Sequence, residues 1–334
     1  MDVQDRVRGC LLGGAIGDAL GAPIEFQSLR EIRKHHGQEG ISGYVATWRG
    51  TTGLVTDDTQ MTLFTIEGLT RRTDADGVAV TDVREAYLRW LDTQEHKAPP
   101  PADRPYRTGA LREEGWLYSR RAPGNACLSG LHHPFPGPSP LGTPGPVNPG
   151  SKGCGTVMRS APFGLTAPYD ARAAFELSAA CAQITHGHPT GYLAAGAFAA
   201  IVARLMTGEP LEAAVHHALD LLAGHPLHEE TSDALRAALA LAVGGEPTPE
   251  RVESLGGAWV AEEALAIGVY CALAEPSPER ALLLSVNHSG DSDSTGSVCG
   301  NLVGALRGAD ALPAAFLRPL EGRDTIERLA AALL

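Results

Sequence analysis

The stretch GGAIGDALGA, residues 13–22, decides the fold. Its glycines and alanines leave room for the backbones of two helices to approach each other closely. Two further stretches have the same small-residue texture, GYLAAGAFAAIVARL at 191–205 and GNLVGALRG at 300–308. Together they predict an all-α fold, a compact multi-helix bundle.

Helical spacing recurs along the whole chain. Apolar residues follow one another at three- and four-residue steps, which is typical of amphipathic helices. The clearest sets are Val7, Cys10, Leu11, Ala15 and Ala19, then Ala173, Leu177, Ala180 and Ile184, and finally Leu235, Ala238, Leu239 and Ala242. Alternating β-branched runs are nearly absent, and only GYVATW at 43–48 resembles a short strand.

The prolines mark one long irregular segment. Between Ala98 and Gly155 the chain carries 12 of its 24 prolines and no apolar pattern of helical length. Loops this long inside a compact domain are usually functional or disordered. Because the segment ends in GSKGCGTVMRSAPFGL at 150–165, a return to small and apolar residues, we expect it to line a site. The chain is therefore predicted to form a single domain, 1–334, with a Pro/Gly-rich loop insertion at about 98–150.

Composition narrows the classes of function. A net charge of −12 argues against a nucleic-acid or anionic-membrane surface, because both need a basic face. The six cysteines form no CxxC pair, which favours buried free thiols over disulfides or zinc ligands. The N-terminus MDVQDRVRGCLLGG lacks a signal-type pattern, and no apolar run is long enough to span a membrane. We expect a cytoplasmic protein.

Two acidic clusters, VTDDTQM at 55–61 and GDSDSTGSVCGN at 290–301, are the candidate functional features. In the first, Thr56 is a predicted helix cap and Asp57 and Asp58 occupy the first turn. In the second, Asp293 or Ser294 can cap the following small-residue helix. Helix capping alone accounts for much of both clusters.

Metal binding is the alternative interpretation of the clusters. Capping needs one oxygen, whereas the two clusters together offer four carboxylates and several hydroxyls. Carboxylate and hydroxyl oxygens are the ligands that Mg²⁺ and Mn²⁺ prefer. If the clusters met, their like charges would raise one another's pKa unless cations were present. The sequence leaves both interpretations open.

A family resemblance favours the metal site. The ordered set GCLLGGAIGDALGAPIEF, TDDT, KGCGTVMR, THGHP and GDSDST, from residue 9 to about 308, resembles the ADP-ribosylglycohydrolase family. The family includes dinitrogenase reductase-activating glycohydrolases and ADP-ribosyl-arginine hydrolases. The resemblance implies an all-α fold that holds two adjacent Mg²⁺ or Mn²⁺ ions, with ADP-ribose bound beside them.

By this resemblance, the metal ligands are Thr56, Asp57, Asp58, Asp291, Asp293 and Ser294. Ser294 is chosen over its neighbour Thr295 on the family pattern D-x-D-[S/T]. Some relatives have Asn where this chain has Cys154, and the arginine-specific branch resembles this chain in having Cys.

Residues outside the acidic clusters complete the predicted site. KGCGTVMR offers backbone N–H groups as a cradle for a diphosphate. In isolation the motif favours a plain glycine turn, and the family resemblance favours the cradle. Trp259 offers a flat face for adenine or ribose, with a core indole as the alternative. The resemblance implies that the substrate is contacted by Gly153, Cys154, Gly155, Thr156, Val157, Met158 and His186. It also brings Glu25 near the reactive ribose, with an exposed surface position as the alternative.

The predicted reaction is hydrolysis of the bond between ADP-ribose and a modified protein. Such bonds break through an oxocarbenium-like transition state, and the cations can anchor ribose hydroxyls and activate a water. Asp58 or Asp291 is the expected base, with Glu25 as a second group for proton transfer. Arginine is the expected acceptor. Serine-linked or other ADP-ribose, a silent ADP-ribose binder and a dimetal phosphoesterase are the alternatives. Asp18 and His188 are expected to have structural roles.

Overall fold

The computed structural model describes residues 2–47, 50–71 and 80–333, and in these ranges the chain folds into α-helices and 3₁₀ turns without a β-strand. The all-α prediction is confirmed. The α-helices are α1 (Val3–Gly21), α2 (Leu29–His36), α3 (Asp57–Thr70), α4 (Val80–Glu95), α5 (Asn125–His132), α6 (Ala161–Thr166), α7 (Ala171–Ala182), α8 (Pro189–Met206), α9 (Leu211–Leu222), α10 (Glu229–Ala242), α11 (Pro249–Glu253), α12 (Ala261–Ala274), α13 (Pro278–Val286), α14 (Ser292–Arg307), α15 (Ala314–Leu317) and α16 (Arg323–Ala332). The 3₁₀ turns are η1 (Leu111–Glu113), η2 (Gly115–Leu117), η3 (Cys154–Thr156) and η4 (Ala309–Ala311).

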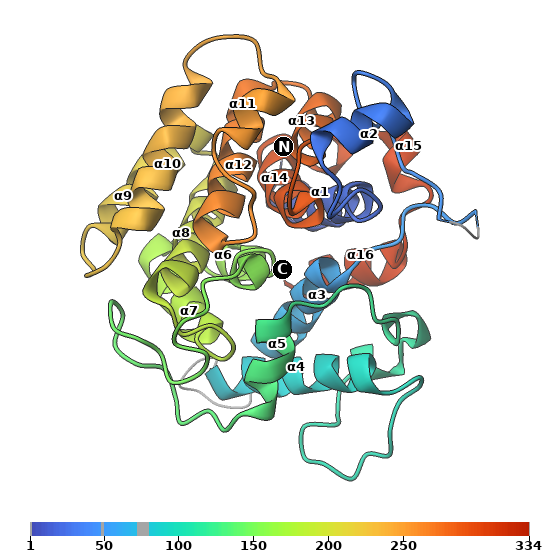
Figure 1. Ribbon diagram of the computed structural model, residues 1–334. Coiled ribbons are helices and arrows are strands. Elements are labelled where there is room, and N and C mark those ends of the chain that lie inside the picture. Colours follow the sequence, from blue (N-terminus) through green and yellow to red (C-terminus); the bar gives the residue numbers. More distant parts are fainter. Residues whose placement is uncertain (1, 48–49, 72–79, 334) are drawn as a thin grey trace.

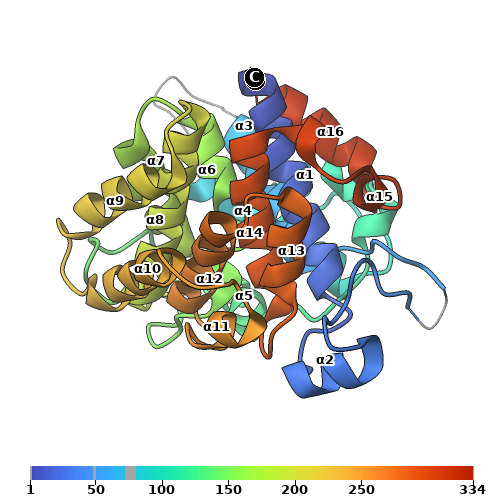
Figure 2. The same ribbon diagram turned by 90° about the horizontal axis from the view of Figure 1, so that it is seen from above.

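The centre of the bundle is the antiparallel pair α1 and α14, which lie side by side (Figures 1 and 2). Glycines of one helix face glycines of the other, and a Cβ added at Gly13 or Gly17 would overlap the carbonyl oxygen of Gly300 or Gly296. Gly21, at the end of α1, contacts the backbone of Ser292 at the start of α14. The seam therefore fixes the first turn of α14 beside the segment that follows α1.

Helix α8 is the buried hydrophobic centre of the other half of the bundle, with α6, α7, α9 and α12 packed around it (Figure 1). In the described part of the chain it is also the one helix long and apolar enough to cross a membrane, with a mean hydropathy of 1.3, and 94% of it is buried. This corrects the expectation that no run reaches that length. Its burial identifies it as a core helix.

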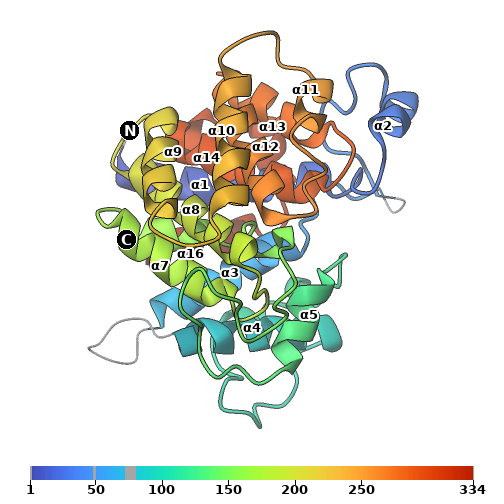
Figure 3. The same cartoon turned by 60° about the vertical axis from the view of Figure 1, so that its left-hand side comes forward.

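The predicted loop insertion at 98–150 is irregular but anchored, and it includes α5 and two 3₁₀ turns (Figure 3). A buried ion pair between Arg89 of α4 and Glu67 of α3, at 2.7 Å, supports this segment. Arg89 donates to the carbonyl of Tyr106 at 3.0 Å, and Glu67 accepts from the N–H of Leu111 at 3.1 Å. One stretch of the segment is thus fixed to α3 and α4.

Two local predictions are wrong and one is confirmed. Residues 43–47 form no strand, and Trp48 lies outside the described residues. Helix α7 exists, but its buried face is shifted by one residue, so that Ala173 is exposed and Ala174 is buried. All six cysteines are free thiols, as expected, and all but the half-buried Cys154 are buried.

Candidate active site

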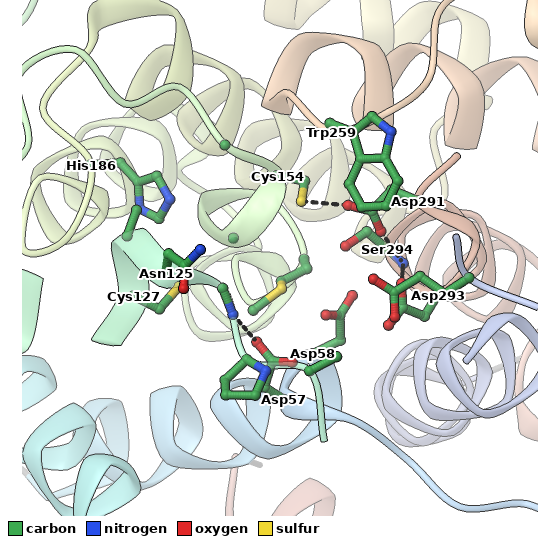
Figure 4. Close-up of a pocket in the computed structure, with 18 of the residues that line it drawn as sticks. Asp57, Asp58, Asn125, Cys127, Cys154, His186, Trp259, Asp291, Asp293 and Ser294 are labelled. Carbon is green, nitrogen blue, oxygen red and sulfur yellow. Dashed lines mark hydrogen bonds between the residues drawn. The ribbon is translucent and has the colours of Figure 1, made fainter. Parts of the chain in front are cut away.

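A cavity of about 410 Å³ opens where the starts of α3 and α14 face residues 122–127, which lead into α5, and residues 153–158, which contain η3 (Figure 4). The loop insertion does line a site, as predicted. The predicted residues on the cavity wall are Glu25, Asp57, Asp58, Gly153, Cys154, Gly155, Met158, His186, Trp259, Asp291, Asp293 and Ser294. Both acidic clusters therefore border one cavity, although more than two hundred residues separate them in the sequence.

The first cluster stands on the N-terminus of α3. Thr56 is the N-cap, as predicted, and its hydroxyl accepts from the N–H of Asp58 at 3.3 Å. The same hydroxyl lies 2.8 Å from Asp18 and 3.3 Å from Asp293 Oδ2, so Thr56 joins the two clusters behind the cavity wall. Buried Asp18 also accepts from the N–H and hydroxyl of Thr59. Asp18 thus anchors the helix start, which is the structural role expected for it.

The second cluster stands on the N-terminus of α14. The N-cap is Asp291, not Asp293 or Ser294 as the sequence suggested, because Asp291 Oδ1 accepts from the N–H of Ser294 at 3.2 Å. Asp293 Oδ1 accepts from the same N–H at 2.9 Å. Ser294 lies on the cavity wall, whereas the Thr295 hydroxyl donates away from it to the carbonyl of Ser285 at 2.7 Å. The choice of Ser294 over Thr295 agrees with this geometry.

The acidic wall is formed by Asp57, Asp58, Asp291 and Asp293, and the described residues that line the cavity include no lysine or arginine to pair with them. Each of the four side chains is at most 4% exposed. Burial is the main cause that raises their pKa values, and for Asp57, Asp58 and Asp293 a neighbouring aspartate is the next. Within the described chain, Asp58 Oδ2 is buried without a hydrogen-bond partner. An all-oxygen cluster with an unpartnered carboxylate oxygen fits a hard divalent cation.

Glu25 extends the acidic wall. A carboxylate oxygen of Glu25 lies within 4.8 Å of ligand oxygens of Asp291 and Asp293. Burial, followed by the charges of Asp293 and Asp57, raises the pKa of Glu25 to about 9. The exposed-surface alternative for Glu25 is excluded, because the residue is half-buried on the cavity wall.

The glycine segment touches the acidic wall through Cys154, whose thiol donates to Asp291 Oδ2 at 2.7 Å. Burial, and next the charge of Asp291, raises the pKa of the Cys154 thiol, which keeps it a donor. The predicted cradle offers fewer N–H donors to a ligand than expected. The N–H groups of Cys154, Val157 and Met158 already bond to protein carbonyls.

Two predicted substrate contacts point away from the cavity. Thr156 is fully buried and its hydroxyl donates to the carbonyl of Gly191 at 2.8 Å, while Val157 lies in the hydrophobic core. Successive side chains rotate by about 120° in a 3₁₀ turn, so residues that follow one another cannot all face one ligand. These two side chains therefore do not face the cavity, whereas Gly153, Cys154, Gly155 and Met158 line it.

His186 packs against the glycine segment and is held from behind. Buried Arg159 donates to the Thr185 hydroxyl at 2.7 Å, and that hydroxyl lies 2.8 Å from His186 Nδ1. The Thr185 hydroxyl accepts from the guanidinium and can donate to His186 Nδ1 at 2.8 Å or to the carbonyl of Ala182 at 3.5 Å. The shorter distance favours donation to Nδ1, and in that tautomer Nε2 is protonated. Burial, and next the charge of Arg159, lowers the pKa of His186 to about 3. A neutral His186 therefore faces the cavity as a donor. His188 instead caps α8 through Nδ1, as expected.

Trp259 was predicted from the sequence, whereas Phe26, Gly124 and Asn125 also line the cavity and were not predicted. Trp259 is 45% exposed, which rules out a core indole, and it stacks on Phe26 with ring centroids 5.2 Å apart. Asp57 Oδ2 accepts from the N–H of Gly124 at 3.4 Å, next to Asn125 on the wall. Two sequence signals could have identified these residues. Phe26 directly follows Glu25, and the short stretch of small and polar residues APGNAC, at 122–127, interrupts the proline-rich segment.

Comparison with known proteins agrees with the motifs. The family model described as ADP-ribosylglycohydrolase matches residues 1–334. The chain is 27% identical over 320 residues to the ADP-ribosyl-[dinitrogen reductase] glycohydrolase of Rhodospirillum rubrum, with 96% of this chain and 91% of that protein covered. It is 24% identical over 329 residues to the ADP-ribosylarginine hydrolase Tri1 of Pseudomonas putida, with 98% and 78% covered. A solved structure named ADP-ribosylglycohydrolase-related protein complex matches with a TM-score of 0.67 at 27% identity, covering 99% and 98% of the two chains.

Proposed function

The chain belongs to the ADP-ribosylglycohydrolase family and is a hydrolase, and from that premise we propose that it releases ADP-ribose from protein arginine side chains with the help of two divalent cations. The observation that carries the proposal is the meeting of four buried aspartates from two helix N-termini on one cavity wall. Without cations the charges of these aspartates oppose one another. Such a cluster is costly to bury, and cation binding offsets that cost.

The ligand set offered to the cations consists of Thr56, Asp57, Asp58, Asp291, Asp293 and Ser294. When bound, Mg²⁺ or Mn²⁺ supplies charge that polarises ribose hydroxyls and lowers the pKa of a water. Asp58 is the first candidate for the base, because it lines the cavity and its Oδ2 has no hydrogen-bond partner within the described chain. Glu25, beside Asp291 and Asp293, is the second group for proton transfer. Asp291 is a third candidate, although its Oδ2 already accepts from Cys154.

The other end of the cavity suits the diphosphate of ADP-ribose. The Nε2–H of His186 is a neutral donor held in place by Thr185 and Arg159. The His186 ring packs closely against the backbone of Gly153 and Gly155, because neither residue has a Cβ. A Cβ added at either position would lie 3.2 Å from the ring. A ligand that spans the cavity would thus place its phosphates near donors and its reactive ribose at the acidic wall.

The preference for arginine is supported by charge and by a relative. A protonated guanidinium can leave as a neutral guanidine with little acid assistance, whereas a serine alkoxide needs a placed proton donor. The net charge of −12 favours approach of a cationic acceptor. The Pseudomonas putida relative is named for action on ADP-ribosylarginine.

Product analysis with matched peptides tests the proposal. Initial rates are measured on arginine-linked and serine-linked ADP-ribosyl peptides after chelation and again after addition of Mg²⁺ or Mn²⁺. We expect intact ADP-ribose as product, faster release from arginine, no activity after chelation and recovery with either cation. AMP as product would indicate a phosphoesterase, and a clear serine preference would overturn the acceptor. Full activity of metal-stripped enzyme would refute the cation requirement.

A further inference from the structure

The rim of the cavity carries an exposed aromatic stack, in which the sequence predicts a face for adenine or ribose at Trp259 and no role for Phe26. Phe26 is 67% exposed and Trp259 45% exposed, and their rings stack at an interplanar angle of 21°. Both line the cavity. We call Phe26 and Trp259 the rim pair. Two large apolar side chains stacked against each other at the edge of a site mark a surface for recognition.

The backbone on both sides of the stack is strained. Phe26 has φ +67°, and Ala258, directly before Trp259, has φ +62°. Residues with a Cβ rarely adopt this conformation, and it costs free energy. Packing in the hydrophobic core does not explain the positive φ of Phe26, because that side chain lies mostly in solvent. Strain at an exposed position beside a cavity is a feature of functional sites.

The rim pair borders the acidic wall. Phe26 directly follows Glu25, whose carboxylate lies near those of Asp291 and Asp293. The segment of Trp259 is bonded both to the same wall and to the glycine segment. The N–H of Asp291 donates to the carbonyl of Gly257 at 3.0 Å, and the N–H of Cys154 donates to the carbonyl of Trp259 at 3.3 Å. Figure 4 shows the Trp259 indole beside Asp291. A group held by the rim pair would therefore lie beside the acidic wall, where the proposed function puts the reactive ribose and the acceptor attached to it.

Resting on the proposed function, we propose that the rim pair binds the guanidinium of the acceptor arginine and so selects arginine-linked ADP-ribose. A guanidinium is planar, stacks on aromatic faces and is attracted by their π-electrons. Glu25 adds a carboxyl group beside Phe26 that can accept from guanidinium N–H groups. A serine acceptor offers neither charge nor a planar face, so it gains nothing from the rings.

The test compares ring-removing variants on two substrates. Phe26→Leu and Trp259→Leu remove a ring, Trp259→Phe keeps one, and Tyr169→Leu is the matched control, an 87% exposed tyrosine that does not line the cavity. We expect KM for an arginine-linked peptide to rise roughly 3- to 30-fold in the two leucine variants. The Kd of free ADP-ribose and the KM of a serine-linked peptide should stay unchanged, and Trp259→Phe and Tyr169→Leu should resemble wild type. Thermal melts show that each variant is folded.

A second measurement isolates the charge. Free arginine should inhibit the wild-type enzyme competitively, citrulline, its neutral isostere, should not, and Phe26→Leu should weaken the inhibition by arginine. Equal losses on both linkages, or weaker ADP-ribose binding, would overturn the proposal by showing that the rings bind ADP-ribose itself. Unchanged KM for the arginine-linked peptide would also overturn it while leaving the proposed function intact. A wild-type enzyme inactive on arginine-linked peptide but active on another linkage would refute the arginine acceptor and the rim-pair proposal together.

Discussion

The acidic wall and the rim pair border the same cavity but are built differently. The aspartates of the wall stand on or next to the first turns of α3 and α14 and are at most 4% exposed, whereas Phe26 and Trp259 stand on irregular segments and are mostly or partly in solvent. The α14 side of the wall is backed by the glycine seam of α1 and α14. Groups that must meet within hydrogen-bond distance are held on rigid elements, and groups that select a partner stand on loops.

This difference predicts that the two regions respond differently to substitution. Changes in the acidic wall or the seam should affect catalysis or folding as a whole, because each residue there depends on the others. Changes in the rim should affect one substrate and leave stability alone. The predictions below test that division.

The largest effect is expected from the aspartates themselves. Asp57→Asn and Asp293→Asn should each lower kcat by roughly 100- to 1,000-fold while the protein stays folded, because each removes a charge from a shared site. The double variant should lose far less than the product of the single losses, since residues that act as a unit fail together. Initial rates at saturating Mg²⁺ measure this, with Asp220→Asn on the exposed side of α9 as control. Multiplicative losses would mean that the clusters act independently.

The glycine seam should give the next largest effect. A Cβ at Gly17 would overlap the carbonyl of Gly296, so Gly17→Ala should separate α1 from α14 and lower the free energy of unfolding by about 3 kcal/mol. Gly244→Ala is the matched control, because nothing lies within 4 Å of its added Cβ. Urea titrations of both variants measure the difference. Equal stability of the two variants would show that the seam can relax, which would contradict its role as the rigid support.

The seam illustrates how much the sequence could tell. Gly9, Gly13, Gly17 and Gly21 repeat every fourth residue and so share one helix face, and the small-residue texture was enough to predict close helix packing. The two acidic clusters were placed correctly at helix starts, because Thr56 and the acids that follow form a strong capping pattern. Their meeting in space came only from the family resemblance, since neither cluster carries a signal that points to the other.

Other features depend on backbone geometry that single residues do not encode. The inward rotation of Thr156 and Val157 follows from a short 3₁₀ turn, and a glycine-rich motif fits several turn geometries equally well. The exposed position of Phe26 follows from a positive φ, which a sequence pattern does not predict for phenylalanine. Arg159 was not predicted as a site residue, because its effect passes through Thr185 to His186.

A smaller effect is expected in how the stability of the metal-free protein changes with pH, because buried carboxyl groups in and behind the acidic wall have raised pKa values. The pKa of Asp18 is raised from 3.8 to about 6 and that of Glu25 from 4.5 to about 9. Because both pKa values are raised by folding, the folded state binds more protons than the unfolded state. The contribution of each group to stability is complete below its unfolded pKa. It is lost as pH rises through about 6 for Asp18 and through about 9 for Glu25. Metal-free protein should therefore melt at a lower temperature at about pH 8.5 than at about pH 6.5.

Cation binding should reverse that loss, because a cation takes the place of the protons. We expect Mg²⁺ to raise the melting temperature by a few degrees more at the higher pH than at the lower one. Thermal melts at both pH values with and without Mg²⁺ measure this. The Asp57→Asn/Asp293→Asn double variant should lose the Mg²⁺-dependent part. A shift in melting temperature that is the same at both pH values would contradict cation binding at the acidic wall.

The smallest effect is expected at the donor end of the cavity, where Thr185 connects Arg159 to His186. Thr185→Val keeps the shape and removes the hydroxyl, so His186 loses the group that holds its Nδ1 unprotonated and can adopt the other tautomer. Affinity for ADP-ribose should fall about 10-fold, the size of one lost hydrogen bond to a charged group, while kcat stays close to wild type because the acidic wall is untouched. Thr185→Ser restores the hydroxyl and should restore the affinity. Nitrogen chemical shifts of the His186 ring report the tautomer directly, and a merely structural Thr185 would leave them unchanged. If Thr185→Val lowered kcat as strongly as the aspartate variants, the donor end would belong to the catalytic unit and the division between the regions of the cavity would have to be redrawn.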